Sequence, residues 1–316
     1  MTARIVVGTR NSRLALWQAD FVAHRIRERH PHLEIMLKHI VTTGDRLKDV
    51  PLAQMGIKGV FTRELEEALL SGEIDLAVHS IKDLPNELPP ELALGAIMER
   101  ADAREALVSP RYRTLEKLPK GARVGVSSLR RKAQLLSLRR DLVITDLRGN
   151  IDARITRMDS QNLDAIVLAV AGLQRLGLEE HITAIFPMDS FLPAAGQGAM
   201  TIETRRDDKA LRNTLSFLHH RETAWAVTAE RHFMRVVEED GQMAAGAWAR
   251  IEKKALVLDA AILSGDGHTR LQDSISGIPQ EAGRLAQTLA HRMLAADDRD
   301  VLAAASVASL RKAVHE

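Results

Sequence analysis

Two successive series of short apolar strands and amphipathic helices constrain the fold of this 316-residue chain more than any other feature. In the first series, a helix is expected after Ser12, with an apolar face of Leu14, Trp17, Phe21, Val22 and Ile26, and another over Phe61–Leu70, ended by Gly72. Strands are expected over Arg4–Val7, Glu34–Val41, Ile74–Val78 and Leu92–Met98. This alternation predicts a parallel or mixed sheet, with ligand-binding loops at the carboxyl ends of its strands.

The second series repeats the same rhythm and is followed by a different one. Strands are expected over Arg123–Val126, Leu142–Asp146 and Ala165–Ala169, and helices over Leu129–Arg139, Ile151–Met158 and Val170–Leu176. From residue 208 onward, two helices (209–219 and 222–237) precede strands at 247–251, 255–263 and 270–275 and a helix at 281–295. The small-residue segment Leu192–Gly198 is interpreted as a crossover back to the first domain. We therefore predict an α/β domain of residues 1–99 and 199–216, a second of residues 100–198, and a small α+β domain of residues 217–316.

Composition excludes several classes of chemistry. The chain has no cysteine, so it can form no disulfide, thiolate metal site, iron–sulfur cluster or thioether-linked group. Its twelve histidines show no HExxH pattern or close clustering, so no metal site is expected. Aromatic residues make up only 3%, too few for base stacking, so no nucleic-acid partner is expected. No apolar run approaches the roughly 20 residues that span a bilayer, and no signal sequence is seen, so we expect a cytoplasmic location. We also expect a monomer.

Positive charge is concentrated in Arg123–Arg157. This stretch has nine Lys/Arg against three acids, whereas the whole chain has a net charge of only +2. Arg130 and Arg131 follow the small-residue turn Val126–Ser128, and Arg148 lies in the turn before Asn150. Both places are expected between a strand and a helix, where backbone N–H groups already favour anions. Arginines there suit bidentate capture of carboxylates or phosphates, so we expect a small ligand with several negative charges.

The run Asp75–Pro85 places polar side chains just past a buried strand. In one interpretation, Ser80 and Asp83 cap a turn and Lys82 is a solvated charge. In the other, Asp83 faces a ligand and stabilises a developing cation or moves a proton. The arginines also have a structural interpretation, as partners of surface acids, which is weaker because they occur together with Arg10, Ser12 and Arg154 at loop–helix junctions.

Seven motifs resemble one known family. They are, in chain order, Thr9–Ala19, Lys58–Phe61, Leu76–Pro85, Ser127–Arg131, Leu147–Asn150, Leu168–Leu173 and Pro193–Gly198. Together they resemble porphobilinogen deaminase (hydroxymethylbilane synthase), in order from residue 5 to about residue 235. The resemblance implies two lobes similar to periplasmic binding proteins, which flank a cleft, and a small α+β third domain. It also implies that four porphobilinogen units are joined head to tail with release of ammonia, in tetrapyrrole (porphyrin and heme) biosynthesis.

The resemblance assigns roles to individual residues. Asp83 would be the catalytic carboxylate that stabilises the cation formed when ammonia leaves. Lys58 and Phe61 would belong to a loop over the cleft. The substrate and cofactor carboxylates would be held by Arg10, Ser12, Ser80, Lys82, Ser128, Arg130, Arg131, Arg148, Arg154 and Arg175.

The chain departs from the family pattern at the cofactor. The family attaches a dipyrromethane primer to a cysteine in a loop that follows a Thr-Ala-Glu-Arg helix. Here Thr228–Arg231 is present, but Gly241 stands where the cysteine is expected. Covalent priming through a cysteine is therefore excluded, so chain growth would start from free substrate or from a non-covalently bound oligopyrrole. Three hypotheses stay open: an enzyme that condenses porphobilinogen without a covalent primer, a catalytically silent protein that binds porphobilinogen or a linear pyrrole, and a basic module for other polyanions.

Overall fold

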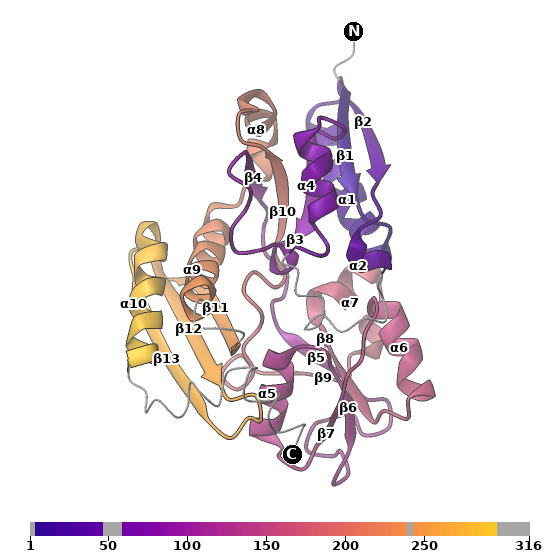
Figure 1. Cartoon of the computed structure of the whole chain (residues 1–316), viewed down its shortest axis with the longest axis vertical. Coiled ribbons are helices and arrows are strands. Elements are labelled where there is room, and N and C mark those ends of the chain that lie inside the picture. The colour runs from indigo at the N-terminus through magenta and orange to yellow at the C-terminus, as the bar shows by residue number, and fades with distance from the viewer. Residues whose placement is uncertain (1–3, 47–58, 239–242, 296–316) are drawn as a thin grey trace. The chain divides into compact units, whose positions relative to one another are not determined.

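The computed structural model describes residues 4–46, 59–238 and 243–295, which form two compact units (Figure 1). Unit 1 comprises residues 1–101 and 198–224, and unit 2 comprises residues 102–197 and 225–316. Each unit is described by itself below. The predicted division into three domains remains a prediction, because unit 2 contains both the second α/β series and the C-terminal elements.

Unit 1 is built on a five-stranded mixed sheet in the order β2-β1-β3-β10-β4. Strands β1 (Arg4–Thr9), β2 (Glu34–His39) and β3 (Leu76–Ser80) are parallel. Strand β10 (Met200–Arg205) runs antiparallel to both β3 and β4 (Leu92–Ile97). The predicted mixed sheet is therefore present, although β10 was not expected. The strand β10 was missed because it follows the small-residue segment that was interpreted only as a crossover.

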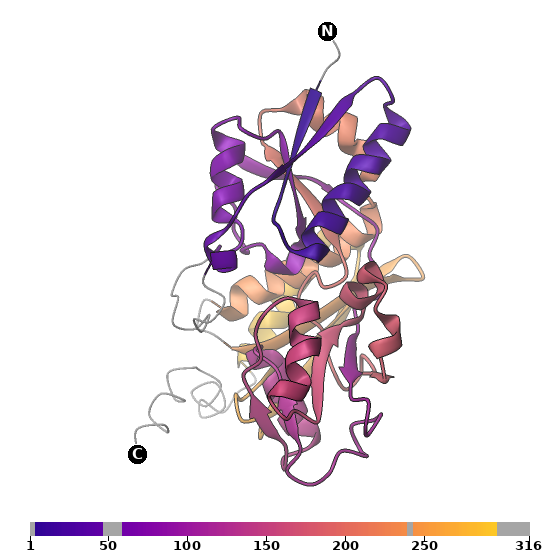
Figure 2. The ribbon, with the colours of Figure 1, turned by 90° about the vertical axis from the view of Figure 1, so that its right-hand side faces the viewer.

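Helices cover both faces of this sheet (Figure 2). Helix α1 (Arg13–Arg29) packs on the face that carries Val7 and Val78, whereas α4 (Arg63–Leu70) packs on the face that carries Ala77. The shorter helices of this unit are α2 (Thr43–Arg46) and α8 (Lys209–Leu215), with 3₁₀ turns η1 (Ile81–Asp83) and η3 (Ser216–Leu218).

The predicted apolar face of α1 is partly wrong. The residues that it buries are Ala15, Gln18, Ala19, Val22, Ala23 and Ile26. Trp17 is instead 36% exposed and stacks on Phe21, with ring centroids 5.3 Å apart. Phe21 is half-buried and packs against the apolar core of this unit, so only Trp17 of the two aromatic residues lies off the buried face. The helical period of 3.6 places small alanines on that face.

Unit 2 contains a second five-stranded sheet in the order β7-β6-β8-β5-β9. Its strands are β5 (Glu105–Val108), β6 (Arg123–Gly125), β7 (Val143–Thr145), β8 (Ala165–Ala169) and β9 (Ala184–Ile185). Strands β6, β7 and β8 are parallel, whereas β5 is antiparallel to β8 and β9. Helices α5 (Leu129–Leu138), α6 (Ile151–Ser160) and α7 (Val170–Leu176) follow the three parallel strands as predicted, and the turn η2 (Glu179–His181) leads to β9.

The C-terminal part of unit 2 is a three-stranded antiparallel sheet of β11 (Ala244–Glu252), β12 (Ala255–Leu263) and β13 (Arg270–Gly277). Helices α9 (Arg221–Glu238) and α10 (Ala282–Ala295) contribute to the same apolar core as this sheet, and η4 (Pro279–Glu281) precedes α10. Helix α9 begins in unit 1 and continues into unit 2. The predicted α+β character of this region is confirmed.

Helix α5 joins the two sheets of unit 2. Its residue Ala133 forms an apolar cluster with Leu192 and with Ala244, Ala261 and Leu263 of the C-terminal sheet. Arg270 of β13 adds hydrogen bonds from its guanidinium to the carbonyls of Ser190 (2.7 Å) and Asp189 (3.2 Å). Among the described helices, none is long and apolar enough to cross a membrane.

Candidate functional site

In unit 1, the end of β3 presents the predicted catalytic carboxylate. Ile81 is fully buried, and its N–H donates to the Ala199 carbonyl at 3.1 Å, which anchors the turn η1. Lys82 and Asp83 of the same turn are exposed. Among the described residues, no hydrogen bond or ion pair involves the Asp83 carboxylate, which is therefore accessible to a ligand.

Ser80 does not cap this turn with its side chain. Its hydroxyl accepts a hydrogen bond of 2.7 Å from Nε2 of Gln18, a buried residue of α1. This bond ties the end of β3 to the helix that follows β1. Because β1 and β3 are parallel neighbours, the loops after them lie at the same edge of the sheet.

Arg10 and Ser12 follow β1 at that edge. The Ser12 hydroxyl accepts a hydrogen bond from the Ala15 N–H and caps α1, as predicted. The Arg10 guanidinium donates to both oxygens of Asp45, at 2.6 and 3.2 Å, and lies 4.2 Å from the ring centroid of Phe61. Burial alone would raise the pKa of Asp45, but the hydrogen bond and charge of Arg10 hold that pKa below its usual value. A ligand carboxylate at Arg10 would share the guanidinium with this internal acid.

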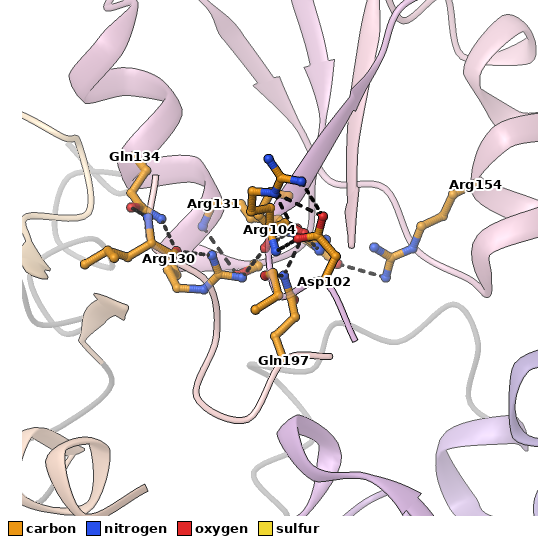
Figure 3. A network of polar contacts seen from close by, with 12 residues as sticks. Asp102, Arg104, Arg130, Arg131, Gln134, Arg154 and Gln197 are labelled. Atoms are coloured by element: carbon orange, nitrogen blue, oxygen red, sulfur yellow. Dashed lines mark hydrogen bonds and ion pairs between the residues drawn. The ribbon is translucent and has the colours of Figure 1, made fainter. Parts of the chain in front are cut away.

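In unit 2, the N-terminus of α5 carries the adjacent arginines. The Ser128 hydroxyl accepts a hydrogen bond from the Arg131 N–H and caps the helix. Both guanidiniums bind the buried carboxylate of Glu105. Figure 3 shows Arg130 and Arg131 side by side in the polar network of this unit. Burial lowers the pKa of Arg130, while the charge of Glu105 opposes this effect. Glu105 is not among the residues predicted from the sequence, although an acid at the start of the apolar strand Glu105–Val108 is a signal that the sequence contains.

The remaining predicted arginines follow β7 and β8. Arg148 donates from Nε to Asp146 at 2.9 Å. Arg154 of α6 donates to the Gly149 carbonyl at 2.8 Å and to the Ser127 hydroxyl at 3.3 Å, and Figure 3 shows it approaching the network from a different helix than Arg130. Burial lowers the pKa of Arg175 on α7 to about 10, which still leaves it protonated at neutral pH.

Because β6, β7 and β8 are parallel, the loops that follow them and lead to Arg130, Arg131, Arg148 and Arg154 lie at one edge of the unit 2 sheet. Arg175 lies farther along, in the last turn of α7. Two predicted residues, Lys58 and Gly241, lie outside the described residues. Within the described ranges, no group of three or more His, Asp or Glu is arranged to hold a metal ion.

The fold and these strand ends define a class of α/β protein in which guanidinium groups lie on the loops and helices that follow parallel strands. Residues 5–213 match the family model described as "Porphobilinogen deaminase, dipyromethane cofactor binding domain". The chain therefore belongs to the porphobilinogen deaminase family.

Relatives match over almost the whole chain. The porphobilinogen deaminase of Geotalea uraniireducens is 44% identical over 94% of this chain and 93% of its own length. The porphobilinogen deaminase of Geobacter sulfurreducens is 45% identical over 95% of this chain and 94% of its own length. That of Chloroherpeton thalassium is 47% identical over 87% of this chain and 88% of its own length. Among solved structures, the methionine-binding protein MetQ is similar with a TM-score of 0.45 and 16% identity, over 68% of this chain and 88% of that one.

Proposed function

We propose that this chain is a transferase that condenses porphobilinogen units head to tail with release of ammonia, and yields hydroxymethylbilane or a shorter oligopyrrole. The single observation that carries the proposal is the exposed Asp83 carboxylate on a turn anchored by Ile81, at the same sheet edge as Arg10. Membership of the family and relatives named porphobilinogen deaminase support the activity. We place the protein in the cytoplasm as a monomer.

The chemistry explains why a fixed carboxylate is needed. The C–N bond of the aminomethyl group breaks, the nitrogen leaves as ammonia, and a methylene-pyrrolinium cation remains. A carbon of a second pyrrole forms the new C–C bond and then loses its proton. Asp83 would stabilise the cation and accept pyrrole N–H hydrogen bonds, because a preorganised charge near developing charge lowers the barrier.

The arginines would hold the acetate and propionate groups that each added pyrrole brings. In unit 2, Arg130 and Arg131 share the carboxylate of Glu105, and two guanidiniums with one carboxylate carry a net positive charge. Arg148, Arg154 and Arg175 of the same unit would bind further carboxylates. In unit 1, Arg10, Ser12 and Lys82 would do the same beside Asp83. Lys58 and Phe61 would border the substrate.

The same residues of unit 2 fit the carboxylates of a dipyrromethane, the group named in the family model. A thioether bond to it does not fit, because the chain contains no cysteine. We therefore propose that chain growth starts from free porphobilinogen or from an oligopyrrole held without a covalent bond.

The test is incubation of the purified protein with porphobilinogen, with ammonia measured over time and pyrrole products analysed by mass spectrometry. Wild type should release ammonia, whereas Asp83→Ala should not. The matched control is Asp20→Ala, which removes another exposed carboxylate of unit 1 from the outer side of α1 and should keep wild-type rates. Ammonia release no higher than that of Asp83→Ala would reject the enzyme, and calorimetric binding without release would leave a binding protein.

Gly241→Cys tests how the chain is primed. If only the thiol is missing, this variant should gain the mass of two pyrrole units during expression, by intact mass spectrometry. An unmodified mass would mean that the surrounding sequence, which reads Glu239-Asp240 before Gly241, no longer accepts the primer.

A further inference from the structure

Glu105 is an acid in a place where acids are rare. It starts β5, is fully buried, and is followed by the apolar residues Ala106, Leu107 and Val108. A buried carboxylate is costly unless charged donors compensate it. The charged donors here are Arg130 and Arg131 at the start of α5, the helix that follows β6.

The hydrogen bonds of Glu105 fix both guanidiniums. Arg131 donates from Nε to Oε1 at 3.1 Å and from Nη2 to Oε2 at 2.8 Å, which uses the side edge of its planar group. Arg130 donates from Nη2 to Oε1 at 2.7 Å and from Nη1 to the Leu192 carbonyl at 2.7 Å. Each guanidinium is therefore held at two points, so neither can turn about its own axis without losing a bond.

One edge of Arg131 is left for a ligand. A guanidinium has five N–H donors, and Glu105 takes two of them from Arg131. Within the described residues, Nη1 of Arg131 makes no hydrogen bond to protein, so the end formed by Nη1 and the second N–H of Nη2 can bind a carboxylate in a bidentate manner. The trio of two arginines and one glutamate also keeps one net positive charge, which favours an anion there.

We propose that Glu105 is a positioning residue, which holds Arg130 and Arg131 so that the end edge of Arg131 is presented to a ligand carboxylate. This proposal rests on the proposed function for the identity of the ligand. The competing explanation is that Glu105 only neutralises charge. The two explanations predict opposite changes in affinity when the negative charge is removed.

The first experiment is calorimetric titration with porphobilinogen of two proteins that both carry Asp83→Ala, so that the ligand is not consumed, and that differ by Glu105→Gln. Positioning predicts a Kd raised about tenfold or more, the scale of one charge-assisted bidentate contact. Charge neutralisation alone predicts a lower Kd, because the net charge of the trio rises. An unchanged or lowered Kd overturns the proposal.

Two further variants separate positioning from general damage. Glu230→Gln is the matched control, because Glu230 is a fully buried glutamate of the same unit whose carboxylate accepts from the N–H groups of Gly196 (2.6 Å) and Ala249 (2.7 Å). It should lower the melting temperature and leave the Kd unchanged. Glu105→Asp keeps the charge but shortens the side chain by one methylene, so its Kd should stay above that of wild type; full rescue would indicate a role in charge alone. Glu105→Asp also serves if Glu105→Gln does not fold.

A second measurement needs neither turnover nor ligand. NMR of the arginine side chains should show a slowly exchanging Nε–H signal that disappears in Arg131→Lys and exchanges rapidly in Glu105→Asp. Rapid exchange of the Arg131 Nε–H in wild type would show that Glu105 does not hold this guanidinium in place, and would overturn the proposal. If porphobilinogen neither binds nor reacts while this signal is protected, the proposed function fails and the positioning role of Glu105 stands.

Discussion

Gly267→Ala should destabilise the chain more than an ordinary glycine substitution. Gly267 lies in the loop between β12 and β13 with φ of +73°, and a Cβ there would lie 2.5 Å from the Ala133 carbonyl oxygen and 2.6 Å from the Ser137 nitrogen of α5. The left-handed conformation costs a non-glycine residue about 1–2 kcal/mol. Overpacking against a backbone that cannot rotate away adds about 1–3 kcal/mol. We therefore expect a total loss of about 2–5 kcal/mol in the free energy of unfolding.

The matched control is Gly177→Ala. The difference between the two variants gives the overpacking cost of Gly267→Ala in the free energy of unfolding. Gly177 ends α7 in the same unit with φ of +65°, and a Cβ there would meet no heavy atom within 4 Å. Gly177→Ala should lose only the free energy that the left-handed backbone conformation costs a non-glycine residue. Urea unfolding followed by tryptophan fluorescence measures both variants, since Trp225 and Trp248 belong to unit 2. Equal losses for the two variants would refute the close packing of this loop on α5.

Three further predictions concern buried and exposed polar groups. Burial raises the pKa of Glu66, and the charge of Glu203 acts in the same direction. The folded state therefore holds this proton more tightly than the unfolded state does. Wild type should lose stability as the pH rises from the ordinary carboxyl pKa through the raised pKa of the folded state. Glu66→Gln should remove this dependence in urea titrations at several pH values, and an unchanged pH slope would contradict it. Gln134→Leu should lower the free energy of unfolding by about 1–3 kcal/mol in the same assay, because the buried Leu192 N–H loses its acceptor at 2.7 Å. The Leu192 carbonyl keeps Arg130 as a donor. A loss no larger than that of a surface substitution would count against the bond between Gln134 and the Leu192 N–H. Asp83→Asn should lower ammonia release on the order of a hundredfold with an unchanged melting temperature, and a large fall in that temperature would indicate a structural role instead.

The helices and parallel strands of the α/β series could be predicted because their hydrophobic patterns are local. The strand Ala165–Ala169 and the helix Val170–Leu176 are confirmed at both ends. The predicted strand Ile74–Val78 is displaced by two residues, to Leu76–Ser80, because the polar His79 and Ser80 continue it. His79 can do so because its Nε2 lies 3.0 Å from the buried Glu203 on β10, a partner far away in the sequence.

The candidate site could be predicted by residue type but not by pairing. Loop–helix positions identified Arg10, Arg130 and Arg131, since small residues and caps mark such junctions. Their acids could not be found in this way. Asp45 and Glu105 lie 35 and 25 residues from the nearest arginine that they bind, and only the folded sheet brings them together.

The apolar contact between α5 and the C-terminal sheet has a consequence for truncated forms of the protein. A truncated product that stops at residue 213, where the family model ends, would lack Ala244, Ala261 and Leu263. Ala133 and Leu192 would then face water, and the helix that carries both adjacent arginines would have no backing. We expect such a fragment to aggregate. The last hundred residues therefore stabilise the helix that carries the two adjacent arginines, and this role does not depend on the missing cysteine.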